Sequence, residues 1–120
     1  MKITLIDDNR DNRDALSRLL RLDGNEVETG SDANDVLGKS VNPPDALLVD
    51  YLLPGKDGVT LIKELRDHEQ WNNTPIILIT GDAGVQIPQG HLGRFCLLLK
   101  PVTLDQIYTA IATAKHLPRP

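Results

Sequence analysis

The stretch Ala46-Leu47-Leu48-Val49-Asp50 is a continuous apolar run that ends in a carboxylate. Three more apolar runs lie at residues 3–6, 76–79 and 97–99. Because their apolar residues are continuous rather than alternating, we expect strands that are covered on both faces. Residues 25–29 form a weaker strand candidate.

Stretches with helical periodicity separate these runs. The first predicted helix spans residues 10–22 and stops before Gly24. The last one begins at a capping box in which Thr103 is followed three residues later by Gln106. Two more helices are predicted between them: a short one from an N-cap at Ser31 through Leu37, and one marked by Val59, Ile62 and Leu65.

The alternation of strands and helices indicates right-handed crossovers and a parallel sheet. Five strands in 120 residues fit a flavodoxin-like, doubly wound α/β fold with the strand order 2-1-3-4-5. Residues 81–94 are the exception, because several glycines and Pro88 lower their helix propensity. We therefore expect an irregular or shortened fourth helix within a single domain that covers residues 1–120.

Composition narrows the class of protein. The net charge of -4 arises from 17 acidic and 13 basic residues without a basic stripe, which argues against direct nucleic-acid binding. Cys96 is the single cysteine, so an internal disulfide is excluded. No apolar run approaches the roughly 20 residues of a membrane span. We expect a cytoplasmic protein that does not contact the membrane.

Polar residues mark the ends of the apolar runs: Asp7 and Asp8, Asp50, Thr80 and Lys100. Each has an ordinary structural interpretation as a cap, turn, strand or surface residue. However, the carboxyl ends of parallel strands meet at one edge of a sheet, so these side chains should converge. Three neighbouring carboxylates repel one another unless a cation is present, and Mg²⁺ prefers oxygen ligands of this kind.

Missing motifs narrow the chemistry further. The chain has no Walker loop, no GxGxxG and no GxSxG motif. A flavin phosphate would be repelled by Asp7 and Asp8. The five polar residues at the ends of the apolar runs instead suit phosphoryl transfer to a carboxylate nucleophile. A phosphatase with an aspartyl nucleophile remains an alternative, although such enzymes use Asp-x-Asp where this chain has Asp7-Asp8-Asn9.

Over nearly its whole length the chain resembles the receiver domain of two-component response regulators. The matching segments are Leu5-Ile6-Asp7-Asp8-Asn9, Leu48-Val49-Asp50-Tyr51-Leu52-Leu53-Pro54-Gly55-Lys56-Asp57-Gly58, Ile79-Thr80-Gly81 and Leu99-Lys100-Pro101. The resemblance implies phosphorelay signalling, in which Asp50 accepts a phosphoryl group from a phosphohistidine. The donor would be a histidine kinase or a histidine phosphotransfer protein.

The resemblance also implies a ligand set for Mg²⁺. Asp8 and Asp50 would bind the ion directly, together with the backbone carbonyl of Leu52, and Asp7 would act through water. The apolar side chain of Leu52 leads us to expect restricted access for the attacking water and slow loss of the phosphoryl group. Such a domain promotes its own phosphorylation and slow hydrolysis, but it does not turn over an external substrate as an enzyme.

The remaining implied roles fall on the last two strands. Thr80 would hydrogen-bond the phosphoryl group, and Lys100 would pair first with Asp50 and then with the phosphate. The Lys100-Pro101 peptide bond would be cis. The switch position, three residues before this lysine, is usually Tyr or Phe in the family, but here it is Leu97.

Leu97 and the irregular residues 81–94 favour an alternative function, in which the domain docks on a partner without phosphorylation. Several segments resemble receivers of hybrid histidine kinases, where a degraded fourth helix is familiar. Given this altered helix, we expect at most a weak homodimer. The effector is not indicated, and no output domain is expected within these 120 residues.

Overall fold

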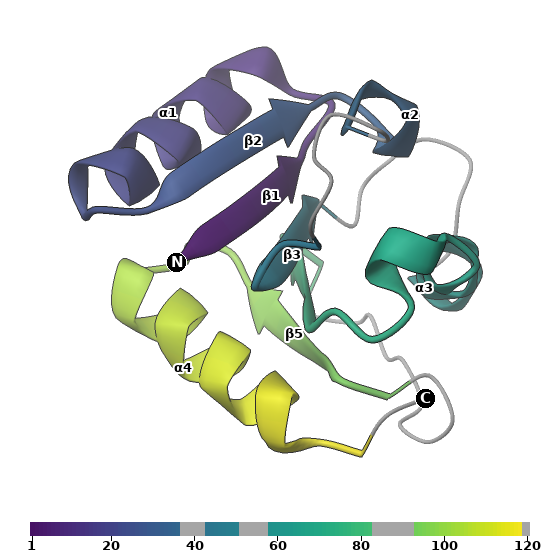
Figure 1. Cartoon of the computed structure of the whole chain (residues 1–120). Coiled ribbons are helices and arrows are strands. Elements are labelled where there is room, and N and C mark those ends of the chain that lie inside the picture. Colours follow the sequence, from purple (N-terminus) through teal and green to yellow (C-terminus); the bar gives the residue numbers. More distant parts are fainter. Residues whose placement is uncertain (37–42, 51–57, 83–92, 119–120) are drawn as a thin grey trace.

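The computed structural model describes residues 1–36, 43–50, 58–82 and 93–118. A five-stranded parallel sheet forms its centre, in the order β2-β1-β3-β4-β5 (Figure 1). The strands are β1 (Lys2–Ile6), β2 (Glu26–Gly30), β3 (Ala46–Asp50), β4 (Ile76–Thr80) and β5 (Phe95–Leu99). The flavodoxin-like α/β fold predicted from the apolar runs is confirmed.

Helices cover both faces of this sheet. Within the described ranges they are α1 (Arg10–Leu22), α2 (Ala33–Val36), α3 (Gly58–Arg66), α4 (Leu104–His116) and the short 3-10 helix η1 (Glu69–Trp71). Figure 1 shows α1 and α4 on one face of the sheet and α2 and α3 on the other. The irregular helix expected over residues 81–94 lies largely outside the described residues, so α4 corresponds to the last helix predicted from the sequence.

Strand alternation divides the core into two layers. Ile6, Val49 and Leu78 pack on the side of α2 and α3, whereas Leu48 and Ile77 pack on the side of α1 and α4. Every residue of β3 and β4 is buried. Burial on both faces explains why these strands appear in the sequence as continuous apolar runs.

The helix ends follow the expected capping chemistry, with one correction. Thr103 and Gln106 form the predicted capping box at the start of α4. For α2, Ser31 is not the capping residue. The Asp32 carboxylate accepts a hydrogen bond from the Asp35 backbone N–H at 3.0 Å, and Ser31 donates to the Asp35 carboxylate instead. Asp and Ser are comparable capping residues, so sequence preference alone does not choose between neighbours.

Candidate functional site

Three carboxylates meet at the carboxyl edge of the sheet. Asp7 and Asp8 follow β1, and Asp50 ends the adjacent strand β3. One carboxylate oxygen from each residue lies within 4.8 Å of the others. Asp7 and Asp50 are each only 6% exposed, whereas Asp8 is exposed. The strand ends thus bring together the three acids singled out in the sequence, with one of them open to solvent.

Lys100 supplies a positive charge to this cluster. Its ammonium nitrogen lies 3.0 Å from a carboxylate oxygen of Asp50. The residue follows β5, and its backbone N–H donates to the carbonyl of Thr80 at 2.7 Å. The Lys100-Pro101 peptide bond is cis. The last residue of β4 and the lysine after β5 are therefore held side by side.

Thr80 reaches the carboxyl edge of the sheet from the layer of α2 and α3. It ends β4, which pairs with β3 on one side and β5 on the other. Its side chain is buried, and its hydroxyl oxygen accepts a hydrogen bond from the Asp82 backbone N–H at 3.1 Å. By alternation along the strand, Thr80 shares its face with Leu78, whereas Lys100 shares its face with Leu98. The two side chains thus come from opposite faces of the sheet.

Burial and charge act together on Asp7. Loss of solvent around the carboxylate raises its pKa, and the nearby Asp50 raises it further. The Asn9 backbone N–H, which donates to Asp7 at 2.9 Å, and the charge of Lys100 oppose this increase. The net effect is a raised pKa, so Asp7 carries its negative charge at a free-energy cost that a bound cation would reduce.

The donor set fits a hard divalent ion. All three groups offer carboxylate oxygens, which Mg²⁺ prefers, and the exposed Asp8 leaves room for the waters that this ion retains. Asp7, Asp8 and Asp50 are the residues of the described ranges that could hold it. The backbone carbonyl of Leu52, which the sequence resemblance assigns to the same ion, lies outside the described residues.

The first turn of α1 is attached to this site by a cap at Asn9, which the sequence offers, and by a contact of Arg13 that the sequence alone does not predict. Arg13 donates from its guanidinium to the carbonyl of Asp7 at 2.8 Å. Asn9 caps the helix, because its side-chain oxygen accepts from the Asn12 backbone N–H at 2.9 Å. The spacing Asn9-x-x-Asn12 is the one available signal, since it places both residues in one helical turn after the acidic pair.

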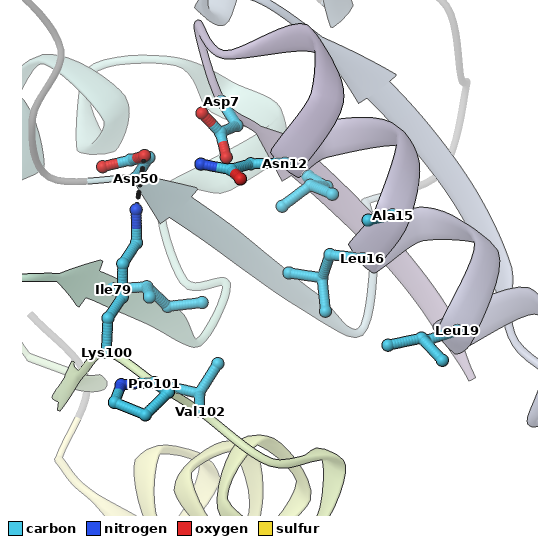
Figure 2. A pocket seen from close by; sticks show the side chains of 11 residues that line it. Asp7, Asn12, Ala15, Leu16, Leu19, Asp50, Ile79, Lys100, Pro101 and Val102 are labelled. Carbon is cyan, nitrogen blue, oxygen red and sulfur yellow. Dashed lines mark hydrogen bonds and ion pairs between the residues drawn. The ribbon is translucent and has the colours of Figure 1, made fainter.

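A groove of about 460 Å³ runs away from the site between α1 and residues 100–102, which follow β5 (Figure 2). Its polar end consists of Asp7, Asn12, Asp50 and Lys100. Its remaining lining residues are apolar: Leu5, Ala15, Leu16, Leu19, Ile79, Pro101 and Val102. The reactive groups therefore open onto a mostly apolar channel rather than onto a flat surface.

Leu97 occupies the switch position, where the resemblance to receiver domains implies a Tyr or Phe. It pairs with Leu78 in β4, two residues before Thr80, and packs half-buried against the core on the α3 side. Phe95 lies two residues earlier on the same face and is fully buried. The ring nearest to the site along β5 is thus already part of the core.

The protein-family model described as the response regulator receiver domain matches residues 3–112 of this chain. The chain belongs to the response regulator receiver family. Two similar relatives of this receiver are the regulatory protein AtoC of Escherichia coli, 32% identical over 97% of the chain, and the DNA-binding transcriptional regulator NtrC of Proteus hauseri, 34% identical over 93%. The receiver spans about a quarter of the length of both, with 25% and 24% coverage.

Solved structures agree with this assignment. Chemotaxis response regulator CheY4 of Vibrio cholerae has a TM-score of 0.73 at 26% identity, with 94% of this receiver and 97% of that chain covered. A sensor histidine kinase receiver domain from Pseudomonas aeruginosa PAO1 has a TM-score of 0.72 at 27% identity, covering 95% and 96%. That structure contains a magnesium ion in its active-site cleft.

Within the described ranges, no helix of this receiver is both long and apolar enough to cross a membrane. Receiver domains generally act as non-catalytic switches in two-component signalling. The family assignment therefore identifies the type of module, while the roles of the individual residues rest on the site geometry.

Proposed function

We propose that this receiver accepts a phosphoryl group on Asp50 from a phosphohistidine of a histidine kinase or a histidine phosphotransfer protein. The observation that carries the proposal is the ion pair of 3.0 Å between Lys100 and Asp50, next to two further carboxylates. A nucleophilic carboxylate, a nearby ammonium group and a potential metal site are the parts that phosphoryl transfer needs.

Each residue has a distinct task in this reaction. Asp50 attacks the phosphorus atom, and Lys100 moves its hydrogen bond from the carboxylate to a phosphoryl oxygen. Thr80 donates its hydroxyl to a second phosphoryl oxygen. Bound Mg²⁺ would neutralise phosphoryl charge, held by Asp8 and Asp50 directly and by Asp7 through water. The backbone carbonyl of Leu52 would complete this set.

The groove beside Asp50 supports a protein donor. A phosphohistidine must come within bonding distance of Asp50, so its carrier must cover the adjacent surface. That surface includes the apolar side chains of Leu16 and Leu19, and Leu19 is 52% exposed. An apolar helix face on the donor would bury these residues, and such burial stabilises a complex by about 25 cal/mol per Å² of apolar area.

Intact mass measurement tests the proposal. Incubation with acetyl phosphate and magnesium should add one phosphoryl group to the wild-type protein. The Asp50→Ala variant should gain none, and EDTA should prevent the gain in the wild type. A folded protein that stays unmodified while it binds magnesium would contradict the proposal.

Phosphorylation-independent docking is the second candidate function, and Leu97 is the observation that favours it. Receiver domains usually couple the phosphate to the distant surface through an aromatic ring that rotates inward behind Thr80. Leu97 has no such ring. The two functions differ in one measurement. A partner affinity that does not change on phosphorylation of Asp50 would favour docking, whereas a shifted affinity would favour the phosphorylated switch.

Three finer expectations accompany this proposal. The protein is expected to act in the cytoplasm as a switch rather than as a phosphatase. Similarity to receivers of hybrid kinases stays a prediction. The expected effect of Leu52 on hydrolysis falls on a residue outside the described ranges, and faster hydrolysis in Leu52→Asn would support it.

A further inference from the structure

Asn12 places an uncommitted carboxamide at the polar end of the groove. Figure 2 shows this side chain beside Asp7, extending from α1 toward the gap in front of Asp50. The residue is exposed, and its side-chain amide makes no hydrogen bond with any part of the chain that the structure describes. It therefore has hydrogen-bonding capacity available for a bound molecule.

The position of Asn12 is fixed by its surroundings. Its backbone N–H donates to the Asn9 side chain at 2.9 Å. The neighbouring Arg13 is attached to the carbonyl of Asp7 at 2.8 Å, and the Asn9 backbone donates to the Asp7 carboxylate at 2.9 Å. The helix turn that carries Asn12 is thus held against the same residues that form the acidic site, which limits the entropy lost when its side chain binds a molecule.

The other polar groups lining the groove are charged and already engaged. Asp50 and Lys100 form the ion pair, and Asp7 accepts the Asn9 backbone N–H. Among the lining residues Asn12 is the single neutral hydrogen-bond donor. A departing nitrogen with a new lone pair needs such a donor, since carboxylates would repel it and Lys100 is required for the phosphoryl oxygens.

We propose that Asn12 binds the leaving group of the phosphodonor, an inference that rests on the proposed phosphoryl transfer to Asp50. A carboxylate oxygen of Asp50 forms the new bond to phosphorus while the bond from phosphorus to the imidazole nitrogen breaks. The bonding electron pair stays on that nitrogen, and the side-chain N–H of Asn12 donates a hydrogen bond to it. The second ring nitrogen keeps its proton, so the imidazole leaves neutral.

This role predicts a dependence on the chemistry of the donor. Imidazole leaves with one lone pair in the ring plane on the departing nitrogen, which a single N–H can satisfy. Acetate leaves with its charge shared between two oxygens, one of which water can reach. Loss of the Asn12 amide should therefore slow phosphorylation by an imidazole donor more than phosphorylation by acetyl phosphate.

The test compares rates with monophosphoimidazole and with acetyl phosphate under saturating magnesium. Asn12→Leu, which keeps the same branched arrangement of heavy atoms without the donor, should slow the first reaction about fivefold and the second less than twofold, as for one neutral hydrogen bond. Asn12→Gln, which retains the N–H, should recover part of the loss. Asn72→Leu is the matched control, because Asn72 is exposed before the amino end of β4, away from the site, and it should leave both rates unchanged.

The outcomes separate this inference from the proposed function. If the wild type gains no phosphoryl group from either donor, the proposed function itself fails. If the wild type reacts and Asn12→Leu reacts equally fast, Asn12 does not contact the leaving group. An equal loss with both donors would also overturn the inference, because it would indicate a general effect on the site.

Discussion

At the scale of single residues, the site is a balance between repulsion and compensation. Asp7 and Asp50 lie close together with little solvent, and Lys100 offsets their charge on one side. Such an arrangement costs stability in the absence of a cation, because loss of solvent and the nearby Asp50 disfavour the ionised form of Asp7. The cost gives the site its affinity for a cation, since a bound ion reduces the repulsion.

Asp7→Asn should stabilise the metal-free protein by about 1 kcal/mol near neutral pH. The amide oxygen can still accept the Asn9 backbone N–H, while the charge is removed. The raised pKa of Asp7 means that the folded state binds this proton more tightly than the unfolded chain. The penalty is therefore absent below the unfolded pKa and grows as pH rises through the raised folded pKa.

Urea unfolding in EDTA at neutral pH and at about pH 3.5 measures this effect, and the gain should be smaller in acid. Asp14→Asn, on the exposed surface of α1, serves as the control and should change stability by no more than about 0.5 kcal/mol. A neutral or destabilised Asp7→Asn variant at neutral pH would show that the carboxylates do not repel each other in the folded state.

At the scale of elements, the junction between β2 and α2 depends on Gly30. A Cβ atom at this position would lie 2.7 Å from the Cβ of Asp35 and 2.9 Å from a methyl carbon of Val36. The carbonyl of Gly30 also accepts the backbone N–H of Asp7 at 3.1 Å. The close approach of α2 to the sheet is thus linked directly to the first residue of the acidic site.

Gly30→Ala should destabilise the protein by about 1 to 3 kcal/mol, because α2 must shift to admit the methyl group. Gly81→Ala is a matched control, since a Cβ there would meet no atom within 4 Å. Guanidinium unfolding, followed through the fluorescence of the buried Trp71, compares the two variants. Equal stability of both would mean that the β2 to α2 junction adapts freely.

Arg66 ties α3 to two other parts of the fold. Its guanidinium donates to the carbonyls of Trp71, Thr74, Gly93 and Arg94. Burial, followed by the charge of Arg94, lowers the pKa of Arg66 to about 10, so the group remains protonated near neutral pH. The start of β4 and the start of β5 are held to the same helix end by one side chain.

Arg66→Met should lower stability by about 2 to 4 kcal/mol, because four partly buried carbonyls lose the guanidinium, although those of Trp71 and Arg94 keep a backbone N–H donor. Arg66→Lys should lose less, since an ammonium group can reach some of the acceptors but cannot reproduce the planar fork. Thermal unfolding of both variants provides the comparison. A loss in Arg66→Met no larger than in Arg66→Lys would argue that packing of the side chain, not its hydrogen bonds, matters here.

At the scale of the whole molecule, the sequence determines the sheet more completely than the surfaces around it. The parallel sheet follows from the alternation of strands and helices. The convergence of Asp7, Asp8 and Asp50 follows from where the apolar runs end, because the carboxyl ends of parallel strands share one edge. Asn12 could not be assigned in this way, since the direction of a helix side chain depends on how the helix packs. The burial of Trp71 could not be predicted either, because its neighbours in the sequence are polar, yet the residue is fully buried.

Magnesium should stabilise the whole fold by linkage. At a concentration 100 times the dissociation constant, a ligand that binds only the native state adds about 2.7 kcal/mol. Melting temperature in EDTA and in excess magnesium should therefore differ for the wild type and much less for Asp8→Ala. No difference in the wild type would mean that the three carboxylates do not bind the ion.

Thr80 and Lys100 reach the carboxyl edge from opposite faces of the sheet. A phosphoryl group held by both side chains would connect the two faces of the sheet. It would restrain the layer of α2 and α3 together with the layer of α1 and α4. Amide hydrogen exchange should then slow on both faces at once when Asp50 is phosphorylated. A partner bound on either side of the molecule could thus sense the same covalent change.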